Sequence, residues 1–333
     1  MLAPAALTVG QKAALIAAIA IAILAAAVLA TALLTSVGTA LALWSGALLL
    51  LVAVAWLRPL NPLCHPQLLT HGTRTQRVVV LLHGVSSCPR AFVDFAPLLF
   101  ARGANVLALR MPENGYADRA TDALGRLTAE ALRAWGDAAV DIAAGLGDEV
   151  VVLGISAGGT VAAWCGQNRP EVARAVLVAP MFGLANLGPG LNAAIMRVTL
   201  LLPDFSIWKD PILRRRLAGL PQVAVRQSSR ATGEILRLGH AVLRQAGTTR
   251  AATPAAAVVS NGNDSAVDNG MTEGLAAAWQ RRGVRVRRFA FARSHGLGHE
   301  LVDPLEPGAD PALTYPVLVS LIEGRDPGED RGG

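Results

Sequence analysis

Lysine is almost absent from this sequence, and aromatic residues make up only 5% of it. Lys12 and Lys209 are the only lysines, so arginine carries nearly all of the positive charge. Nucleic-acid modules combine a basic face with interleaved aromatic residues, and that combination does not occur here. We therefore expect no nucleic-acid partner. Arginine clusters such as 214–216 are interpreted as a solvated face or as a contact with anionic lipid headgroups.

Cysteine is also scarce, and its pattern excludes several classes of site. Cys64, Cys88 and Cys165 are odd in number and lack metal-ligand spacing. They fit a reducing compartment slightly better than a disulfide framework. The sequence has no G-x-G-x-x-G loop, so we expect neither a dinucleotide nor any other cofactor, and no metal.

Charge is missing from two long apolar runs near the N-terminus, at 13–34 and 40–57. Each run is long enough to cross a hydrocarbon core of about 30 Å at about 1.5 Å per residue. The first run exceeds the usual apolar core of a cleaved signal peptide. The pattern predicts a transmembrane hairpin of two helices within residues 1–58, followed by a linker over 59–76.

Two basic residues flank the predicted hairpin and indicate its orientation. Lys12 precedes the first run and Arg58 follows the second, whereas the connecting residues 35–39 contain no basic side chain. The positive-inside rule then places both ends on the cytoplasmic side. We predict a multi-pass protein of a bacterial inner membrane with a cytoplasmic catalytic domain.

Apolar strand patterns alternate with helical patterns from 77 to 323. The predicted strands are 77–82, 105–109, 149–153, 173–179, 255–260 and 284–291. The predicted helices are 91–102, 128–144, 271–282 and 312–323. This alternation is typical of an α/β domain whose mainly parallel sheet is covered on both faces. Residues 324–333 are rich in Gly, Asp and Arg and are expected to form a flexible tail.

The stretch 182–253 interrupts the alternation. It contains an amphipathic run at 191–202 and a helical pattern at 234–245. An excursion between two strands, at the sheet edge where ligands bind, favours a lid over the site. A stabilising insertion without a gating role is the alternative.

A G-x-S-x-G pattern, from Gly154 to Gly158, follows the apolar strand at 149–153 and precedes a helical stretch. A serine on such a tight turn needs small neighbours, and glycine suits both positions. The turn presents the hydroxyl to the N–H groups of the helix N-terminus. Ser156 is therefore the candidate nucleophile, and a closely packed turn of small residues is the alternative.

A serine nucleophile needs a base and an orienting carboxylate, which in α/β sheets lie on loops after strands. The loop after 255–260 contains Asp264 and Asp268, and the loop after 284–291 contains His295 and His299. The chain order serine, aspartate, histidine is that of an α/β-hydrolase triad.

These residues resemble the α/β-hydrolase superfamily, in particular its lysophospholipase, monoacylglycerol-lipase and carboxylesterase-like branch. The resemblance covers about 77–322. Its marks are Leu81-Leu82-His83-Gly84, the Gly-Ile-Ser-Ala-Gly elbow, the Asp264 loop and the late His299. Two features depart from the pattern: residues 58–77 leave little room for the usual antiparallel strands, and 109–115 replaces a Pro-Gly-His-Gly loop.

The resemblance implies a role for each candidate residue. Asp264 lies where the family's acid falls, and His299 precedes a family-like Glu-Leu-Val-Asp-Pro ending. The implied triad is Ser156, Asp264 and His299, with the backbone N–H groups of Val85 and Ala157 as the oxyanion hole. Asp268 is then a helix cap, His83 braces its loop, and Ser86 or Ser87 could add a hydroxyl.

The implied function is a membrane-anchored serine hydrolase acting on carboxylic esters of acyl or lipid type. Its expected partners are the bilayer and a small-molecule or lipid ester. The same triad also serves acyltransferases, thioesterases and amidases or peptidases, because leaving-group preference depends on the pocket. A non-catalytic membrane scaffold with a hydrolase fold is the alternative from another class.

Overall fold

The computed structural model describes residues 23–28, 46, 58–208 and 219–327. The chain divides into two compact units, Met1–Arg58 and Pro59–Gly333. In the first unit, residues 23–28 are helical. The predicted spans at 13–34 and 40–57 fall mostly outside the described residues, and within those residues no helix is long and apolar enough to cross a membrane. The hairpin therefore stays a prediction.

The second unit is built on a seven-stranded sheet with the order β1-β3-β2-β4-β5-β8-β9. Its strands are β1 (Gln67–Leu69), β2 (Thr75–Leu82), β3 (Asn105–Leu109), β4 (Gly147–Ile155), β5 (Val172–Val178), β8 (Ala255–Asn261) and β9 (Arg285–Phe291). All neighbours pair in parallel except β1, which runs antiparallel to β3 at one edge. The predicted mainly parallel α/β sheet is confirmed.

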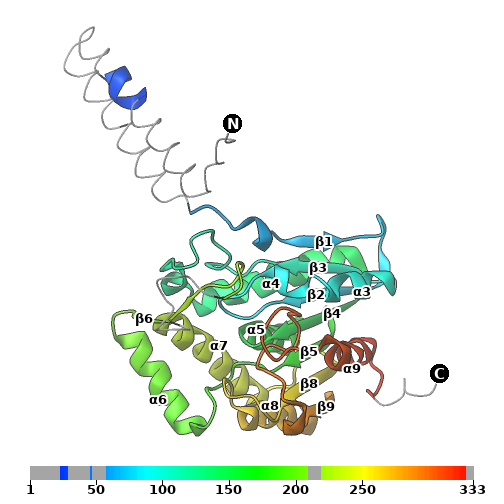
Figure 1. The fold of residues 1–333 in the computed structure, drawn as a ribbon. Helices are drawn as coiled ribbons and strands as arrows, with labels where there is room; N and C mark the ends of the chain where they lie inside the picture. The colour runs from blue at the N-terminus through cyan, green and yellow to red at the C-terminus, as the bar shows by residue number, and fades with distance from the viewer. Residues whose placement is uncertain (1–22, 29–45, 47–57, 209–218, 328–333) are drawn as a thin grey trace. The chain divides into compact units, whose positions relative to one another are not determined.

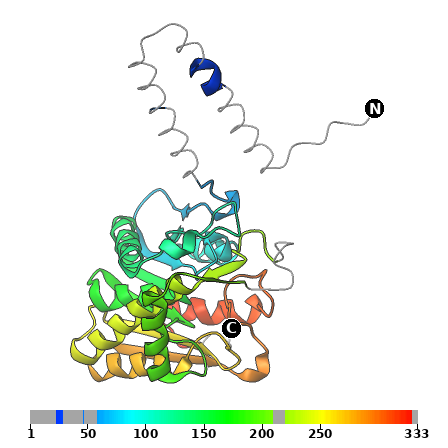
Figure 2. The same ribbon diagram turned by 90° about the vertical axis from the view of Figure 1, so that its left-hand side faces the viewer.

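Helices cover both faces of this sheet (Figures 1 and 2). They are α3 (Phe95–Ala101), α4 (Ala129–Leu146), α5 (Ala157–Asn168), α7 (Ser229–Thr248), α8 (Asn269–Arg281) and α9 (Pro311–Glu323). Successive strand residues point to opposite faces. Val78 and Val80 of β2 thus pack in the cluster of α4, α5, α7 and α8, whereas Val79 and Leu81 pack with α3 and α9.

Two local features differ from the sequence-based expectation. The predicted helix 91–102 is split into a short 3-10 helix, η2 (Pro89–Phe92), and α3. Strand β1 lies in the predicted linker, where no strand was expected. It has only three residues, which is too short for an alternating pattern to be recognised in the sequence.

The insertion between β5 and β8 has two parts of different character. Helix α6 (Gly188–Leu201) and the hairpin of β6 (Ser206–Trp208) with β7 (Arg226–Ser228) expose several apolar side chains. Helix α7 instead buries Ile235 and Leu238 in the main core. Within the described part of the insertion, only α6 and the small hairpin therefore have the exposure expected of a lid.

The cysteines correct one expectation. Cys64 and Cys88 form a disulfide, while Cys165 is buried and free. Cys64 ends the short helix η1 (Pro62–Cys64), and Cys88 is the N-cap of η2. The two cysteines are 24 residues apart, and this spacing did not reveal the pair because the chain fold brings η1 and η2 together.

Candidate active site

Ser156 lies on a sharp turn between β4 and α5, with φ 55° and ψ −119°. A Cβ atom at Gly154 would lie 2.1 Å from the carbonyl oxygen of Gly158, and one at Gly158 would lie 2.1 Å from that of Leu82. Any side chain at either glycine would collide with backbone, which is the physical basis of the G-x-S-x-G pattern. Backbone strain of this kind costs about 1–3 kcal/mol and persists only where the surroundings hold it.

Hydrogen bonds to neighbouring backbone hold the serine turn. The Ser156 N–H donates to Val178 O at 3.0 Å, and its carbonyl accepts from the N–H of Met181 at 3.0 Å. The turn is thus fixed at the carboxyl ends of β4 and β5. Helix α5 begins at Ala157, so the N–H groups of its first turn, which lack helical partners, lie beside the serine.

Asp264 and His299 come together although they lie on separate loops, after β8 and β9. His299 Nδ1 is 2.7 Å from Asp264 Oδ2, and the Asp264 side chain has no exposed surface. The other oxygen of Asp264 accepts from the N–H groups of Ala266 at 2.7 Å and Val267 at 3.2 Å. The carboxylate is therefore held in position on both sides.

Burial alone would raise the pKa of Asp264. The hydrogen bond and charge of His299, together with the two N–H donors, outweigh burial, so the pKa lies below its usual value. An ionised aspartate on Nδ1 favours the tautomer that keeps Nε2 free to accept a proton.

The two competing residues have other contacts. Asp268 accepts from the N–H groups of Gly270 at 2.9 Å and Met271 at 3.1 Å, and so caps α8. His295 is exposed in the short 3-10 helix η5 (Arg293–His295), with its ring 6.2 Å from that of Phe291.

Asn261 connects the aspartate loop to the histidine loop, and no pattern in the sequence identifies it. It is the fully buried last residue of β8, and its Nδ2 donates to the carbonyls of Leu297 at 3.1 Å and Gly298 at 2.8 Å. A strand-ending asparagine carries no sequence signal for this role, because its partners are distant backbone atoms.

The loop after β2 approaches the serine from the other side. A Cβ atom at Gly84 would lie 3.3 Å from Ser156 Cβ, so glycine permits this close approach. His83 Nε2 accepts from the Met111 N–H at 2.9 Å, so its proton is on Nδ1, which donates to Gly84 O at 2.8 Å. Burial lowers the pKa of His83 to about 4, so the ring is a neutral brace.

Ser86 continues this loop in the left-handed region, with φ 68°. Its N–H donates to Asn114 Oδ1 at 2.8 Å. Its buried hydroxyl has no hydrogen-bond partner within the described part of the chain. Asn114 is a second supporting residue that no local sequence pattern identifies, because its partner is 28 positions away.

The histidine loop carries a titratable neighbour. Burial raises the pKa of Glu300 to about 7, although the adjacent His299 charge acts in the opposite direction. Glu300 Oε1 accepts from the Val302 N–H at 3.2 Å, and the Tyr315 hydroxyl of α9 donates to Val302 O at 2.9 Å. The histidine loop is therefore anchored to α9, the helix that packs with α3 on one face of the sheet.

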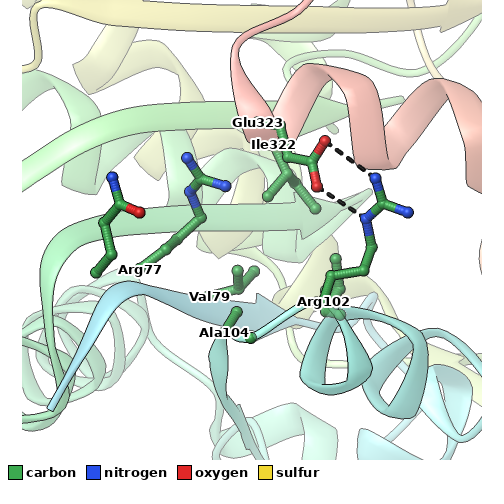
Figure 3. Close-up of a pocket in the computed structure, with 9 residues that line it drawn as sticks. Arg77, Val79, Arg102, Ala104, Ile322 and Glu323 are labelled. Carbon is green, nitrogen blue, oxygen red and sulfur yellow. Dashed lines mark hydrogen bonds and ion pairs between the residues drawn. The ribbon is translucent and has the colours of Figure 1, made fainter. Parts of the chain in front are cut away.

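A pocket at the amino ends of the parallel strands does not belong to this site, which lies at their carboxyl ends (Figure 3). It includes Arg77 near the start of β2, whereas Gly84 lies beyond the end of that strand. Arg77 is paired with Glu149 at 2.8 Å, and Arg102 with Glu323 at 2.8 Å. Because both arginines are paired with carboxylates, this pocket offers no free anion-binding site.

The chain belongs to the alpha/beta hydrolase family, whose model matches residues 79–316. The family predicted from the sequence is thereby confirmed. No curated protein sequence matches the chain.

Solved structures of lipolytic enzymes share this fold. A monoacylglycerol lipase from Paleococcus ferrophilus has 17% identity and a TM-score of 0.59, covering 78% of this chain and 98% of its own. A structure from a report on the metagenome-derived lipolytic enzymes LipS and LipT has 17% identity and a TM-score of 0.58, covering 80% and 100%. A soluble variant of Saccharomyces cerevisiae monoglyceride lipase, solved with a substrate analogue, has 13% identity and a TM-score of 0.58, covering 78% and 89%. At these identities the likeness establishes the fold.

Proposed function

We propose that this protein is a serine hydrolase that cleaves carboxylic esters through an acyl-enzyme. The observation that carries the proposal is the hydrogen bond of 2.7 Å between His299 and the buried Asp264. The two loops that bear them follow the carboxyl ends of β8 and β9, on the same side of the parallel sheet as the strained turn of Ser156 after β4. This combination of a strained serine, a histidine and a buried carboxylate is the arrangement that acyl transfer requires.

Each residue has a defined role in the proposed reaction. His299 Nε2 takes the Ser156 proton as the hydroxyl attacks the ester carbonyl, and returns it to the leaving alcohol. Asp264 holds the imidazole and stabilises its charged form. The N–H groups of Val85 and Ala157 stabilise the oxyanion, and water then releases the acyl group by the same route in reverse.

The proposed substrates are esters of acyl or lipid type. Large apolar side chains are exposed on α6 and just after it: Leu191, Val198, Leu201, Leu202, Phe205 and Ile207. Exposed apolar surface on an insertion next to the site favours contact with acyl chains or lipid. The lipases among the solved structures of this fold support the same substrate class.

We also propose that the apolar runs at 13–34 and 40–57 anchor the protein in a membrane. Two observations give conflicting indications of the side of the membrane on which the catalytic domain lies. Lys12 and Arg58 favour the cytoplasm, whereas the Cys64–Cys88 disulfide is typical of an oxidising compartment. Reporter fusions at the C-terminus, one active only inside the cell and one active only outside, distinguish the two orientations.

A fluorophosphonate probe tests the proposed chemistry. The full-length protein should be labelled, and Ser156→Ala should not be. Ser265→Ala is the matched control, because Ser265 is an exposed serine in the loop of the candidate acid. Equal labelling of the Ser156→Ala protein would reject the triad. A panel of p-nitrophenyl esters from acetate to palmitate then measures acyl-length preference.

A further inference from the structure

Residues 59–64, which follow the predicted spans, are part of the catalytic domain. The Asn61 N–H donates to Gly115 O at 2.9 Å, and the Pro59 carbonyl accepts from the Ala117 N–H at 2.8 Å. Leu60 forms an antiparallel bridge with Tyr116. This segment, called the entry segment below, is therefore bound on both sides of Leu60 to the loop that follows β3.

The disulfide joins the entry segment to the loop that faces Ser156. Cys64 is the last residue of η1, and Cys88 ends the loop of residues 83–88, called the oxyanion loop below. Both cysteines are fully buried. A Cβ atom at Gly115 would lie 2.7 Å from Cys64 Cβ, so the contact has no spare room. A covalent bond thus links the entry segment to a position three residues beyond Val85.

Asn61 provides a second route from the entry segment to the same loop. Its Nδ2 donates to Pro221 O at 2.8 Å. Pro221 belongs to the segment 220–225, and in the same segment the Ala224 N–H donates to Ser86 O at 2.8 Å. The buried Gln222 also donates to Asp303 Oδ2 at 3.4 Å, which connects these residues to the loop of His299.

Ser86 is the point at which these contacts meet. Its backbone conformation is left-handed, with φ 68°, and a serine keeps such a conformation only when neighbours hold it. Asn114 binds its N–H at 2.8 Å, and Ala224 binds its carbonyl at 2.8 Å. Ser86 directly follows Val85, so the contacts that hold Ser86 also restrict the backbone next to the proposed oxyanion donor.

We propose that the entry segment is a positioning element for the oxyanion hole, acting through the Cys64–Cys88 disulfide and through Asn61. The proposal rests on the proposed function, because it assigns Val85 as a donor. If residues 59–64 only connected the predicted spans to the domain, turnover at each active site would not depend on them. The proposal instead makes this turnover depend on residues outside the family match at 79–316.

The first test removes the disulfide in the full-length protein with Cys64→Ala/Cys88→Ala. Turnover of p-nitrophenyl acetate is divided by the number of active sites, measured by burst titration. Loss of an oxyanion donor lowers kcat by about 10²–10³-fold, so a misplaced donor should lower kcat per site by about 10-fold or more, with KM within about twofold. Cys165→Ala, which removes the buried free cysteine of α5, is the matched control and should keep kcat per site.

Burst titration separates positioning from stability. A disulfide that only stabilises the fold would lower the melting temperature and the number of active sites, and leave kcat per site unchanged. That result would overturn the proposal. Loss of kcat per site at a temperature where circular dichroism shows a folded double variant would support it.

One milder change, with a matched control, tests the same route. Asn61→Asp keeps the acceptor that caps η1 at the Leu63 N–H and removes the donor to Pro221 O. It should lower kcat per site by a smaller factor than the double variant, whereas Leu68→Ala, at an exposed side chain of β1 outside the entry segment, should leave kcat per site unchanged. Unchanged kcat per site in Asn61→Asp would remove Asn61 from the proposal.

Chemical reduction provides a reversible form of the experiment. A dithiol reductant converts the disulfide to two cysteine thiols and is itself oxidised to a cyclic disulfide. Reduced wild type should lose kcat per site and regain it on reoxidation, and the double variant should not respond. If Ser156→Ala abolishes probe labelling while neither the double variant nor reduction lowers kcat per site, this inference fails and the proposed function stands. If Ser156→Ala leaves labelling intact, the proposed function itself fails.

Discussion

The serine turn and the oxyanion loop face each other, yet different kinds of contact hold them. The turn is recognisable from two glycines within two positions of Ser156, and backbone at the ends of β2, β4 and β5 surrounds it. The oxyanion loop is held by Asn114, Ala224 and Cys64, which are distant in sequence. One half of the proposed site therefore carries a local sequence motif, whereas the other half has none.

The largest expected effect is on catalysis at the serine turn, whose proposed base is His299. His299→Ala should lower ester turnover by on the order of 10⁴-fold, as loss of a triad member does elsewhere. His295→Ala is the matched control, because that histidine is exposed and lies four residues earlier. Initial rates on p-nitrophenyl butyrate measure both variants. A greater loss in His295→Ala would move the base to that residue.

Gly158→Ala should break the turn itself. The new Cβ atom would lie 2.1 Å from the Leu82 carbonyl oxygen, which is backbone of the central strand and cannot move aside. We expect a loss of about 4 kcal/mol or more in the free energy of unfolding, measured by urea denaturation. Gly274→Ala in α8 is the control, since a Cβ atom there meets nothing within 4 Å, and it should be neutral or stabilising. Similar stability of the two variants would show that the turn tolerates a side chain.

Asn114→Ala tests the long-range half. The Ser86 N–H would lose its partner, at a cost of about 1–3 kcal/mol for an unsatisfied buried donor. We expect lower kcat per active site together with lower stability, because the N–H of Val85 lies next to this contact. Asn168→Ala removes a hydrogen bond to Trp164 at the far end of α5, and should lower stability alone. If both variants lower only stability, the oxyanion loop does not depend on Asn114.

Glu300→Gln should change the pH dependence of stability. The folded pKa is about 7, above the usual 4.5, so the folded state binds a proton that the unfolded state releases. Stability contributed by this group is present below about pH 4.5 and falls as the pH rises to about 7. The variant should flatten this decline in thermal unfolding measured from pH 4.5 to 7.5. Glu306→Gln in the same loop is the control and should keep the wild-type slope.

The smallest expected effect concerns the insertion. Leu201 is 82% exposed, so Leu201→Asp should change the free energy of unfolding by at most about 0.5 kcal/mol. Turnover of a long-chain ester should fall more than that of an acetate ester, because a charge in an acyl contact is costly to desolvate. Equal effects on the two esters would separate α6 from substrate binding.

The family match and the serine turn were accessible from the sequence for the same reason. Continuous apolar strands such as 149–153, and glycines two positions before and after a serine, are local patterns. The supporting residues Asn61, Asn114 and Asn261 were missed because each acts through atoms distant in the chain, and β1 was missed because three residues show no alternating pattern. The slight preference for unpaired cysteines was wrong for Cys64 and Cys88, whose pairing depends on the fold, while Cys165 is free.

Periodicity and the need for small residues beside Ser156 are local patterns, so most of the order of strands and helices and the presence of a tight turn at Ser156 could be predicted from the sequence. Which aspartate meets which histidine depends on how two loops leave adjacent strands, and the structure joins Asp264 to His299 while Asp268 caps a helix. The contact of residues 59–64 with the oxyanion loop likewise exists only once the domain has folded. Such pairings depend on closure of long chain segments, which no local pattern encodes.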